Sequence, residues 1–167
     1  MRRRVNAKGA HEALERIRAA RADVQFSADI IVGFPGETDE HFSETLEFIR
    51  SERFLNIHVF QYSKRAGTEA AAMKDQVPAD IKKLRSETLI SEQKRIHAEI
   101  LNECIGKDFE LLCETTERGE DGKLYAIGHT PSFIQMKVYC SDDTEKGRII
   151  KVRAEGSDGV TLLGSKI

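Results

Sequence analysis

DIIVGFPGETDEHF, residues 29–42, passes from a nearly continuous apolar run through a turn with two glycines and a proline into the start of a helix. Apolar runs of this kind are typical of strands that are covered on both faces in a parallel sheet. Thr38 is the expected N-cap of the helix, and Asp39 and Glu40 in its first turn favour the helix dipole. The stretch therefore predicts a strand over residues 26–34 that leads directly into a helix.

Helix and strand alternate on both sides of this stretch. Residues 10–24 carry apolar side chains at helical spacing, and residues 55–62, LNIHVFQY, alternate between a face with Ile57 and a face with His58 and Phe60. Repeated β-α units surround a parallel sheet or barrel and bind ligands at the carboxyl ends of the strands. We therefore expect the turns GFPGET and QYSKRAGT on one rim, with the His58 face lining the interior. A tight turn without a ligand is the alternative.

The pattern changes near Cys104. A long helix is expected between Pro78 and Gly106, and the segments KDFELLCETT, SFIQMKVYC and GRIIKVRAEGSDGVTLLG then indicate short strands. Several short strands within about 60 residues suit a small closed barrel of the oligonucleotide-binding (OB) type. The predicted fold class is α/β followed by a small all-β OB-like barrel. The expected domains cover residues 1–77 and 106–167, with a connector helix over residues 78–105.

Bulk composition sets limits on the function. The 167 residues carry a formal net charge of -2, which provides no global attraction to nucleic acid or to an anionic membrane. No apolar run reaches the roughly 18 residues that a membrane span needs, so we expect a cytoplasmic chain with no membrane partner. Cys104, Cys113 and Cys140 are far apart in the sequence and are expected to be ordinary reduced thiols, with no metal site.

The longest motifs resemble a known family. DIIVGFPGETDEHFSETLEFI, followed by IHVFQYSKRAGTEAAAM and QVP, is similar to the later strands of the radical S-adenosylmethionine barrel in the tRNA methylthiotransferases. The course GHTPSFIQMKV, GRIIKV and LLG is similar to the TRAM domain that ends these enzymes and holds their RNA substrate. The resemblance implies a partial radical S-adenosylmethionine β/α barrel and a TRAM RNA-binding domain, with the anticodon region of tRNA as the partner.

The resemblance also assigns residues to a cofactor. In the family, the end of the first of these strands contacts the adenine of S-adenosylmethionine through backbone and apolar groups. Glu37 comes one position later than the acidic residue of the general radical-enzyme pattern, and we expect it to hold the turn rather than to take part in chemistry. The residues to which the resemblance assigns the cofactor contact are Ile31, Gly33, Phe34 and Pro35.

The motif that would hold a cluster is missing from the sequence. Radical cleavage of S-adenosylmethionine needs a 4Fe-4S cluster held by thiolates, which the family places on C-x-x-x-C-x-x-C, and no such motif occurs here. By resemblance, residues 1–4 correspond to a stretch after the fourth barrel strand. We therefore expect the C-terminal part of a longer enzyme, with no catalytic residue of its own and no stable binding of either cofactor by this chain alone. The missing N-terminal part of the same enzyme is a candidate partner.

Basic and aromatic residues are the candidates for RNA contact. Lys64 and Arg65 follow the second strand and would face the tRNA backbone or a carboxylate on the modified base, with a solvated surface pair as the alternative. From Lys107 onward, nine Lys and Arg stand against eleven Asp and Glu, with Asp142 among the acids, so a basic face requires the charges to segregate. A mixed solvated surface is the alternative. The candidates in this region are Phe133, Lys137, Tyr139, Arg148, Lys151 and Arg153.

Three functions remain open at this point. The first is part of an enzyme that adds a methylthio group to N6-threonylcarbamoyladenosine next to the anticodon. This subtype is favoured because Lys64 stands where enzymes acting on isopentenyladenosine more often have proline. The second function is a stand-alone RNA-binding module with no catalysis. The third is a fragment of the sister enzyme that methylthiolates a ribosomal protein.

Overall fold

The computed structural model describes residues 6–141 and 143–167. The chain forms two compact units, which divide in the sequence after Ile96. Residues 1–4, which we expect to correspond to a segment of the family, lie outside the described residues. The acidic Asp142 lies outside them as well. None of the helices in the described part is both long and apolar enough to cross a membrane.

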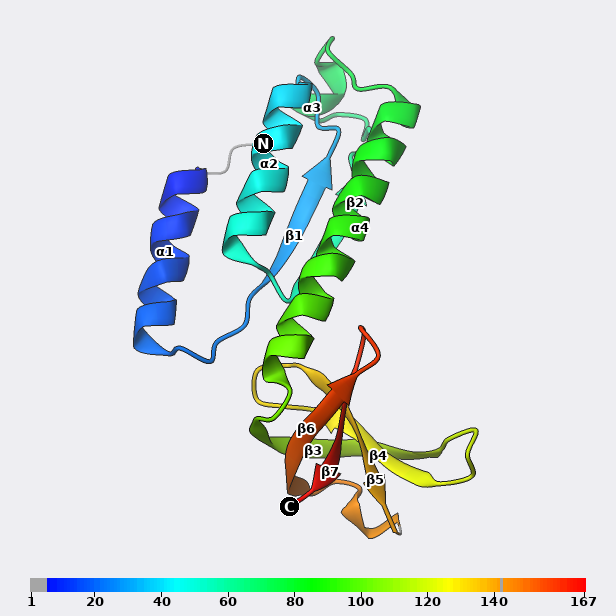
Figure 1. The fold of residues 1–167 in the computed structure, drawn as a ribbon. Coiled ribbons are helices and arrows are strands. Elements are labelled where there is room, and N and C mark those ends of the chain that lie inside the picture. Colours follow the sequence, from blue (N-terminus) through cyan, green and yellow to red (C-terminus); the bar gives the residue numbers. More distant parts are fainter. Residues whose placement is uncertain (1–5, 142) are drawn as a thin grey trace. The chain divides into compact units, whose positions relative to one another are not determined.

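The first unit is built from helices and a two-stranded parallel sheet (Figure 1). The strands pair in register, with Ile30 opposite Val59. The connection between them is α2, so the predicted β-α unit is confirmed. The elements are α1 (Ala7–Ala20), β1 (Ser27–Val32), α2 (Asp39–Glu52), β2 (Asn56–Gln61), α3 (Glu69–Ala72) and the first part of α4 (Ala79–Cys104).

Polar side chains fix where the first two helices begin. Asn6 caps α1 by accepting a hydrogen bond from the Gly9 amide at 2.8 Å. Thr38 caps α2, because its side chain accepts from the His41 amide and the His41 ring accepts from the Thr38 amide. Both N-caps were predictable from sequence, since a short polar side chain before an apolar helical stripe satisfies an otherwise unpaired amide.

Only one face of this sheet is covered. Val32 and Ile57 pack with Ile49 of α2 and Leu89 of α4 in a single apolar core. The expectation that β1 is covered on both faces is wrong for this chain, because its other face is exposed and Ile31 is 36% accessible. The expected interior role of the second strand's outer face is likewise not seen: His58 and Phe60 are exposed. Two strands cannot close a barrel, and within residues 6–141 and 143–167 no further layer covers that face.

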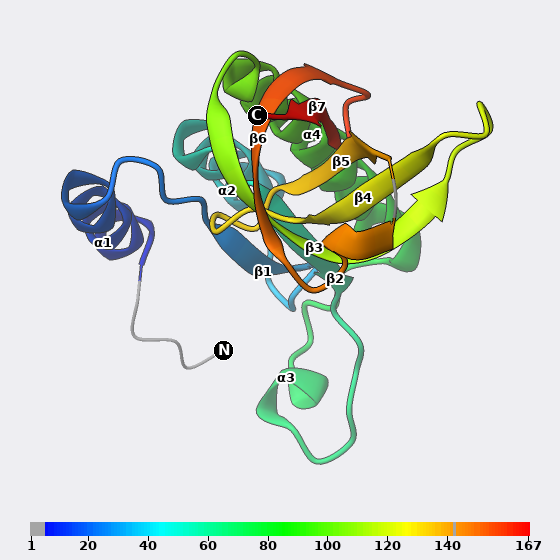
Figure 2. The same cartoon turned by 90° about the horizontal axis from the view of Figure 1, so that it is seen from below.

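The second unit is a closed barrel of five strands in the order β3-β4-β5-β7-β6 (Figure 2). All neighbouring pairs are antiparallel except β5 and β7, which run parallel. This closure is consistent with the predicted OB-like barrel. The strands are β3 (Asp108–Arg118), β4 (Leu124–His129), β5 (Gln135–Cys140), β6 (Ile149–Ser157) and β7 (Leu162–Lys166), with a short 3-10 helix at Asp143–Glu145.

The side chains of β5 alternate between a buried and an outward face. Ile134, Met136 and Val138 are almost completely buried in the barrel, whereas Phe133 and Tyr139 are exposed. Strand β4 was not predicted, because LYAIGH is short and contains a glycine. That glycine is required by packing, since a Cβ at Gly128 would lie 1.7 Å from the carbonyl oxygen of Leu112.

Helix α4 confirms the predicted long helix between Pro78 and Gly106. Its first part carries Leu89 into the core of the first unit, and its last part holds the buried Ile100 and Leu101 of the second. Gly106, with φ 85°, ends it in the left-handed conformation that glycine adopts easily. The predicted domain limits at residues 77 and 105 stay a prediction.

We expect the two units to differ in stability. The first has a sheet with one bare face and open strand edges, whereas the barrel leaves no edge unpaired in its closed ring. Limited proteolysis should therefore cut residues 6–96 about tenfold faster than residues 107–167, since a difference of ~1.4 kcal/mol in opening free energy has this effect. Peptide mapping by mass spectrometry measures both rates in one experiment. Equal rates in the two units would contradict this expectation.

Candidate cofactor pocket and nucleic-acid interface

The turn after β1 has a defined geometry that depends on glycine. Gly33 and Gly36 have φ of 70° and 84°, in the left-handed region that other residues rarely adopt. One carboxylate oxygen of Glu37, Oε1, accepts a hydrogen bond from the Gly33 amide at 2.9 Å. The amide of Gly36 donates to the carbonyl of Asp75 at 2.8 Å. The expected role of Glu37 in holding the turn is thus confirmed by a direct hydrogen bond.

Arg85 of α4 anchors the same turn, a contact that sequence reasoning missed. The guanidinium is buried, and it donates to Glu37 Oε1 at 2.6 Å and to Asp39 Oδ1 at 2.7 Å. It also lies over the ring of Phe42, 5.5 Å from the centroid. Burial lowers the pKa of Arg85, but the hydrogen bonds to Asp39 and Glu37 outweigh burial and raise this pKa above its ordinary value. No local pattern signals this contact, because Arg85 lies 48 residues after Glu37.

The missing side chain of Gly33 makes room for part of the protein itself. A Cβ at this position would lie 2.1 Å from Cγ of Lys82, whose aliphatic stem crosses the glycine. The ammonium of Lys82 donates to the Tyr62 carbonyl at 3.1 Å and so ties α4 to the end of β2. Glycine is therefore required here both by its backbone conformation and by close packing.

A mainly apolar pocket of about 480 Å³ lies beside the turn. The rings of Phe34 and Tyr62 meet edge to face at a centroid distance of 5.4 Å. The Tyr62 hydroxyl oxygen is buried and has no hydrogen-bond partner among the described residues. The pocket lining includes Ile31, Phe34, Phe60, Tyr62, Arg65 and Thr68.

The residues assigned to S-adenosylmethionine divide into two pairs. Ile31 and Phe34 line the pocket, whereas Gly33 and Pro35 are buried and absent from its lining. Aromatic and aliphatic walls such as Ile31 and Phe34 fit a flat heterocycle such as adenine, which needs apolar contact. The pocket therefore fits the base of the cofactor on chemical grounds.

The cysteines do not fit an iron–sulfur cluster. Cys104, Cys113 and Cys140 are all buried and free. Burial raises the pKa of the Cys104 and Cys113 thiols, which disfavours the thiolate that iron requires. Among the described residues these thiols do not form a group that could hold a metal ion.

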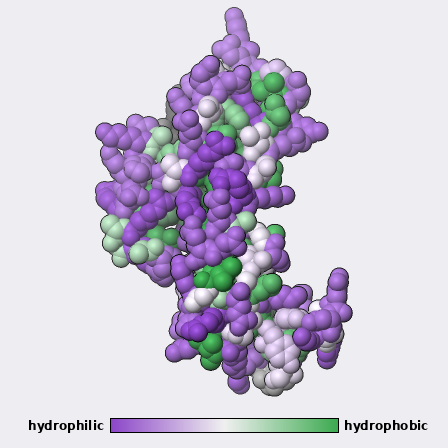
Figure 3. Space-filling model, in the orientation of Figure 1, coloured by the Kyte–Doolittle hydropathy of each residue, from purple (hydrophilic) through white to green (hydrophobic). Residues whose placement is uncertain are grey.

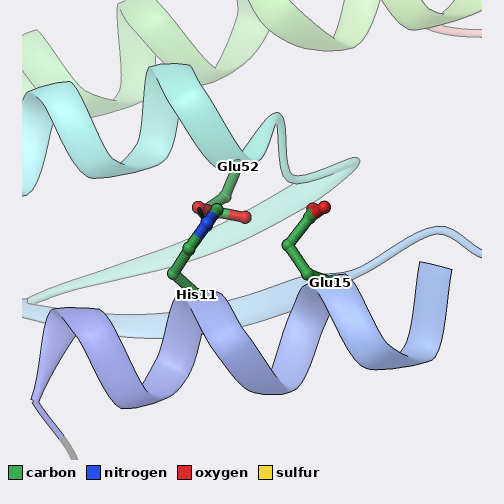
Figure 4. A group of neighbouring side chains, drawn as sticks. All are labelled: His11, Glu15 and Glu52. Carbon is green, nitrogen blue, oxygen red and sulfur yellow. Dashed lines mark hydrogen bonds and ion pairs between the residues drawn. The ribbon is translucent and has the colours of Figure 1, made fainter. Parts of the chain in front are cut away.

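A second cluster of ligand-type side chains joins α1 to α2 (Figure 4). Oε1 of the buried Glu52 lies 2.6 Å from Nδ1 of His11, and Oε2 accepts from Arg18 at 2.8 Å. Burial raises the pKa of Glu52, but the hydrogen bonds from Arg18 and His11 outweigh burial and hold this pKa below its ordinary value. Arg18 also binds Glu15, so its positive charge already lies where a cation would have to bind. The cluster is an ion-pair network that attaches α1.

An ion pair between α2 and α4 predicts acid sensitivity in the first unit. Hydrogen bonds from Arg50 and then Arg95 lower the pKa of Glu92 from 4.5 to about 2. A carboxyl whose pKa is lower in the folded than in the unfolded protein stabilises the fold when the pH is above the pKa of the unfolded state. For Glu92 this stabilisation is lost as the pH falls from about 4.5 to about 2. Replacing Glu92→Gln should cost about 1 kcal/mol at pH 7, because both arginines are half exposed.

Urea denaturation of the wild type and the Glu92→Gln variant, followed by helical circular dichroism, tests this at pH 7 and at pH 3. The two proteins should differ at pH 7 and differ less at pH 3. A difference that is the same at both pH values would show that the carboxylate charge is not responsible.

The predicted RNA-binding residues are spread over both units. Lys64 and Arg65 are exposed in the loop after β2, and Arg65 reaches the lining of the apolar pocket. Phe133, with φ 63°, is 74% exposed and packs on the His129 ring at 5.2 Å. Its groove is also lined by Glu110 and Glu114, which give this surface a negative character.

The basic residues that cluster in the sequence of β6 meet acids in the structure. Arg153 forms a two-pronged ion pair with Asp108 at 2.6 and 2.9 Å. Lys151 stands directly opposite Glu110 in the register of β3 and β6. Arg148 is exposed before the strand. The described residues of β6 therefore do not combine with these neighbours into a basic face.

Lys137 and Tyr139 come together with a residue that sequence reasoning missed. Tyr125 of β4 pairs with Tyr139 of β5, and their rings meet edge to face at 6.3 Å. The ammonium of Lys137 lies 4.4 Å from the centroid of the Tyr125 ring. The missed residue belongs to the missed strand, so identifying β4 would have placed Tyr125 opposite Tyr139.

Across the face shown in Figure 3, hydrophilic residues predominate and hydrophobic ones form small separate patches. The pocket beside the turn and the paired tyrosines of the barrel are thus local features of a mainly polar chain. Together, an apolar pocket at the end of a β-α unit and an OB-like barrel give this chain a candidate small-ligand site and a candidate nucleic-acid surface.

Comparison with curated proteins identifies the class. The dimethylallyladenosine-type relative of Acetivibrio thermocellus, "tRNA-2-methylthio-N(6)-dimethylallyladenosine synthase", is 42% identical over 143 residues, which are 86% of this chain and 29% of that protein. "Threonylcarbamoyladenosine tRNA methylthiotransferase MtaB" of Bacillus subtilis is 33% identical over 153 residues, 92% of this chain and 34% of that protein. A synthase of Nocardia farcinica is 48% identical over 99 residues. The chain matches no family model.

The chain is therefore a homologue of the tRNA methylthiotransferases, and the resemblance predicted from its motifs is confirmed. It spans between 20% and 34% of the length of the relatives that it matches.

Proposed function

We propose that this chain is the C-terminal part of a cytoplasmic radical S-adenosylmethionine tRNA methylthiotransferase. The first unit supplies the last strands of the catalytic barrel and part of the cofactor rim, and the second is a TRAM domain that holds tRNA near the anticodon. The observation that carries the proposal is the match of 86% of the chain, at 42% identity, to a relative named as a tRNA-modifying synthase.

The chemical character of the pocket supports the assignment of this chain to an enzyme that uses S-adenosylmethionine. When bound, S-adenosylmethionine would supply both the radical and the methyl group. In this chain Ile31 and Phe34 would hold its adenine. The thiolates for the 4Fe-4S cluster would come from a segment that precedes this one, because the cysteines present here do not fit a cluster.

For the substrate we propose N6-threonylcarbamoyladenosine. The modified base carries a carboxylate, which needs a cation in the protein, and Lys64 and Arg65 supply cations beside the pocket. A dimethylallyl group is apolar and would not use them. Adenosine with a dimethylallyl group is nevertheless the second candidate, because relatives with this substrate in their names are 36% to 48% identical to this chain.

The source DNA upstream of the Met1 codon tests the proposal. An open reading frame that continues upstream into C-x-x-x-C-x-x-C is expected. A stop codon in frame directly upstream would overturn the proposal and favour a stand-alone RNA-binding module. If the frame is open, incubating the complete protein with tRNA and with ribosomal protein separates the proposed activity from that of the sister enzyme.

A further inference from the structure

Three side chains form a defined group on the outer surface of the barrel. Tyr125, Lys137 and Tyr139 lie on the adjacent strands β4 and β5, and we call them the tyrosine-lysine group. Lys137 covers the Tyr125 ring and Tyr125 meets the edge of Tyr139. Because Tyr139 is 53% exposed, its ring is held in place by neighbours while much of its surface faces solvent.

Tyr125 has a further restraint that fixes the group. Its hydroxyl donates to Asp121 Oδ2 at 2.7 Å, in the loop between β3 and β4. The hydrogen bond to the same carboxylate raises the pKa of Tyr125 above its ordinary value. A ring whose position is fixed before binding loses little conformational entropy when a ligand stacks on the group.

A pocket of about 620 Å³ opens directly beside Tyr139. Arg118 at the end of β3 and Lys123 in the loop just before β4 contribute to its lining, together with the hydroxyl-bearing Thr116 and Ser141. Cations, hydroxyls and an aromatic ring are the groups that proteins use to hold a nucleotide without reading its sequence. The acidic Asp143 also lines the pocket, so we expect the attraction for phosphate to be moderate.

The position of this group in the barrel favours the same ligand. In OB-type barrels, oligonucleotides bind across the second and third strands, between the loop that joins strands one and two and the loop that joins strands four and five. Here the second and third strands of the barrel are β4 and β5. The first of the two loops holds Lys123, and in the second Asp158 organises the turn by accepting from the amides of Val160 and Thr161.

We propose that the tyrosine-lysine group is where the barrel holds single-stranded RNA, with one base stacked on Tyr139 and the neighbouring phosphates near Lys137, Lys123 and Arg118. This inference rests on the proposed function, in which the barrel holds tRNA, and it names the surface that does so. It selects this face over Phe133, whose groove is flanked by Glu110 and Glu114, because two aromatic rings and Lys137 come together here. Lys123 also pairs with Asp121 at 3.8 Å, so we expect Lys137 and Arg118 to contribute more of the attraction for phosphate.

Fluorescence anisotropy with a fluorescein-labelled single-stranded RNA of about ten nucleotides tests the assignment on the 167-residue chain. Tyr139→Ala should raise Kd about tenfold, the effect of losing one stacked base, whereas Tyr139→Phe keeps the ring and should stay within about twofold. Phe133→Ala is the matched control, because it removes an exposed ring from the same barrel and should also stay within about twofold.

Lys137→Gln is a second variant that keeps the aromatic rings, and it should weaken binding about threefold. Three phosphate contacts predict that log Kd rises with log salt concentration with a slope of about 2. Unchanged thermal denaturation of each variant shows that its barrel is intact.

The outcomes separate the inference from the proposed function. If the wild type binds RNA and the Kd is the same in Tyr139→Ala and Lys137→Gln, the assignment of the site to the tyrosine-lysine group is overturned, and the RNA-holding role of the barrel is not affected. Loss of binding in Phe133→Ala with full binding in Tyr139→Ala would do the same and move the site to the other groove. A wild-type chain that does not bind RNA even at low salt would overturn both this inference and the RNA-holding role of the barrel.

Discussion

Replacing Arg85→Met is expected to destabilise the first unit by about 3 kcal/mol, because a buried carboxylate loses the cation that compensates its charge. Glu37 is largely buried and accepts hydrogen bonds from both Arg85 and Gly33. Methionine has a similar length and fills the space, so the loss reports on charge and hydrogen bonds rather than on a cavity. Urea denaturation followed by helical circular dichroism measures the change in free energy of unfolding.

Arg50→Met provides the matched control for this prediction. Arg50 is also paired with a glutamate of α4, but its side chain is half exposed, so the expected loss is about 1 kcal/mol or less. The amide resonance of Gly33 in a nitrogen-15 spectrum should move in Arg85→Met and stay in place in Arg50→Met. Equal losses of stability in the two variants would contradict the role of Arg85 as the anchor of the turn.

Replacing Gly128→Ala is expected to destabilise the barrel by about 3 kcal/mol, the upper part of the range for overpacked sites. The added Cβ would lie 1.7 Å from the carbonyl oxygen of Leu112, which is backbone and cannot turn aside as a side chain can. Gly128 stands opposite Cys113 of β3, next to the register shift between Cys113 and Thr115. The strands must separate to admit one methyl group. Thermal denaturation followed in the near-ultraviolet tyrosine signal measures the loss.

Gly156→Ala is the control within the same barrel. A Cβ at Gly156 would meet no atom within 4 Å, and the residue lies at the register shift between β6 and β7. Its expected effect is within about 0.5 kcal/mol. A Gly128→Ala variant that is as stable as Gly156→Ala would show that the barrel closes differently at this point.

Local patterns predicted most of the elements because each carries its own signals. The cap at Thr38 and the apolar spacing of Leu46 and Ile49 defined α2, and the alternation around Met136 defined β5 and its buried face. The strand β4 was missed because its alternation is short and because Gly128 weakens the strand propensity. The reason for that glycine is a contact with β3, which no local pattern contains.

The candidate sites depended more on contacts between distant segments. Ile31 and Phe34 were placed by motif and do line a pocket, but Arg85 and Lys82 approach the same turn from a helix about 50 residues later. Sequence spacing alone also does not show which charged residues face one another. Lys151 and Arg153 cluster along the chain, yet the register of β3 and β6 places Glu110 and Asp108 opposite them. Tyr125 became visible only once strand pairing was known.

A chimera tests most directly the claim that this chain forms part of a tRNA methylthiotransferase. Residues 6–167 replace the matching segment of MtaB from Bacillus subtilis, of which 34% aligns with this chain, in a host that lacks its own enzyme. Mass spectrometry of the tRNA nucleosides is then expected to show the methylthio form of N6-threonylcarbamoyladenosine, and Arg85→Met in the chimera should reduce it. A soluble, folded chimera that binds S-adenosylmethionine and yet leaves tRNA unmodified would contradict the account.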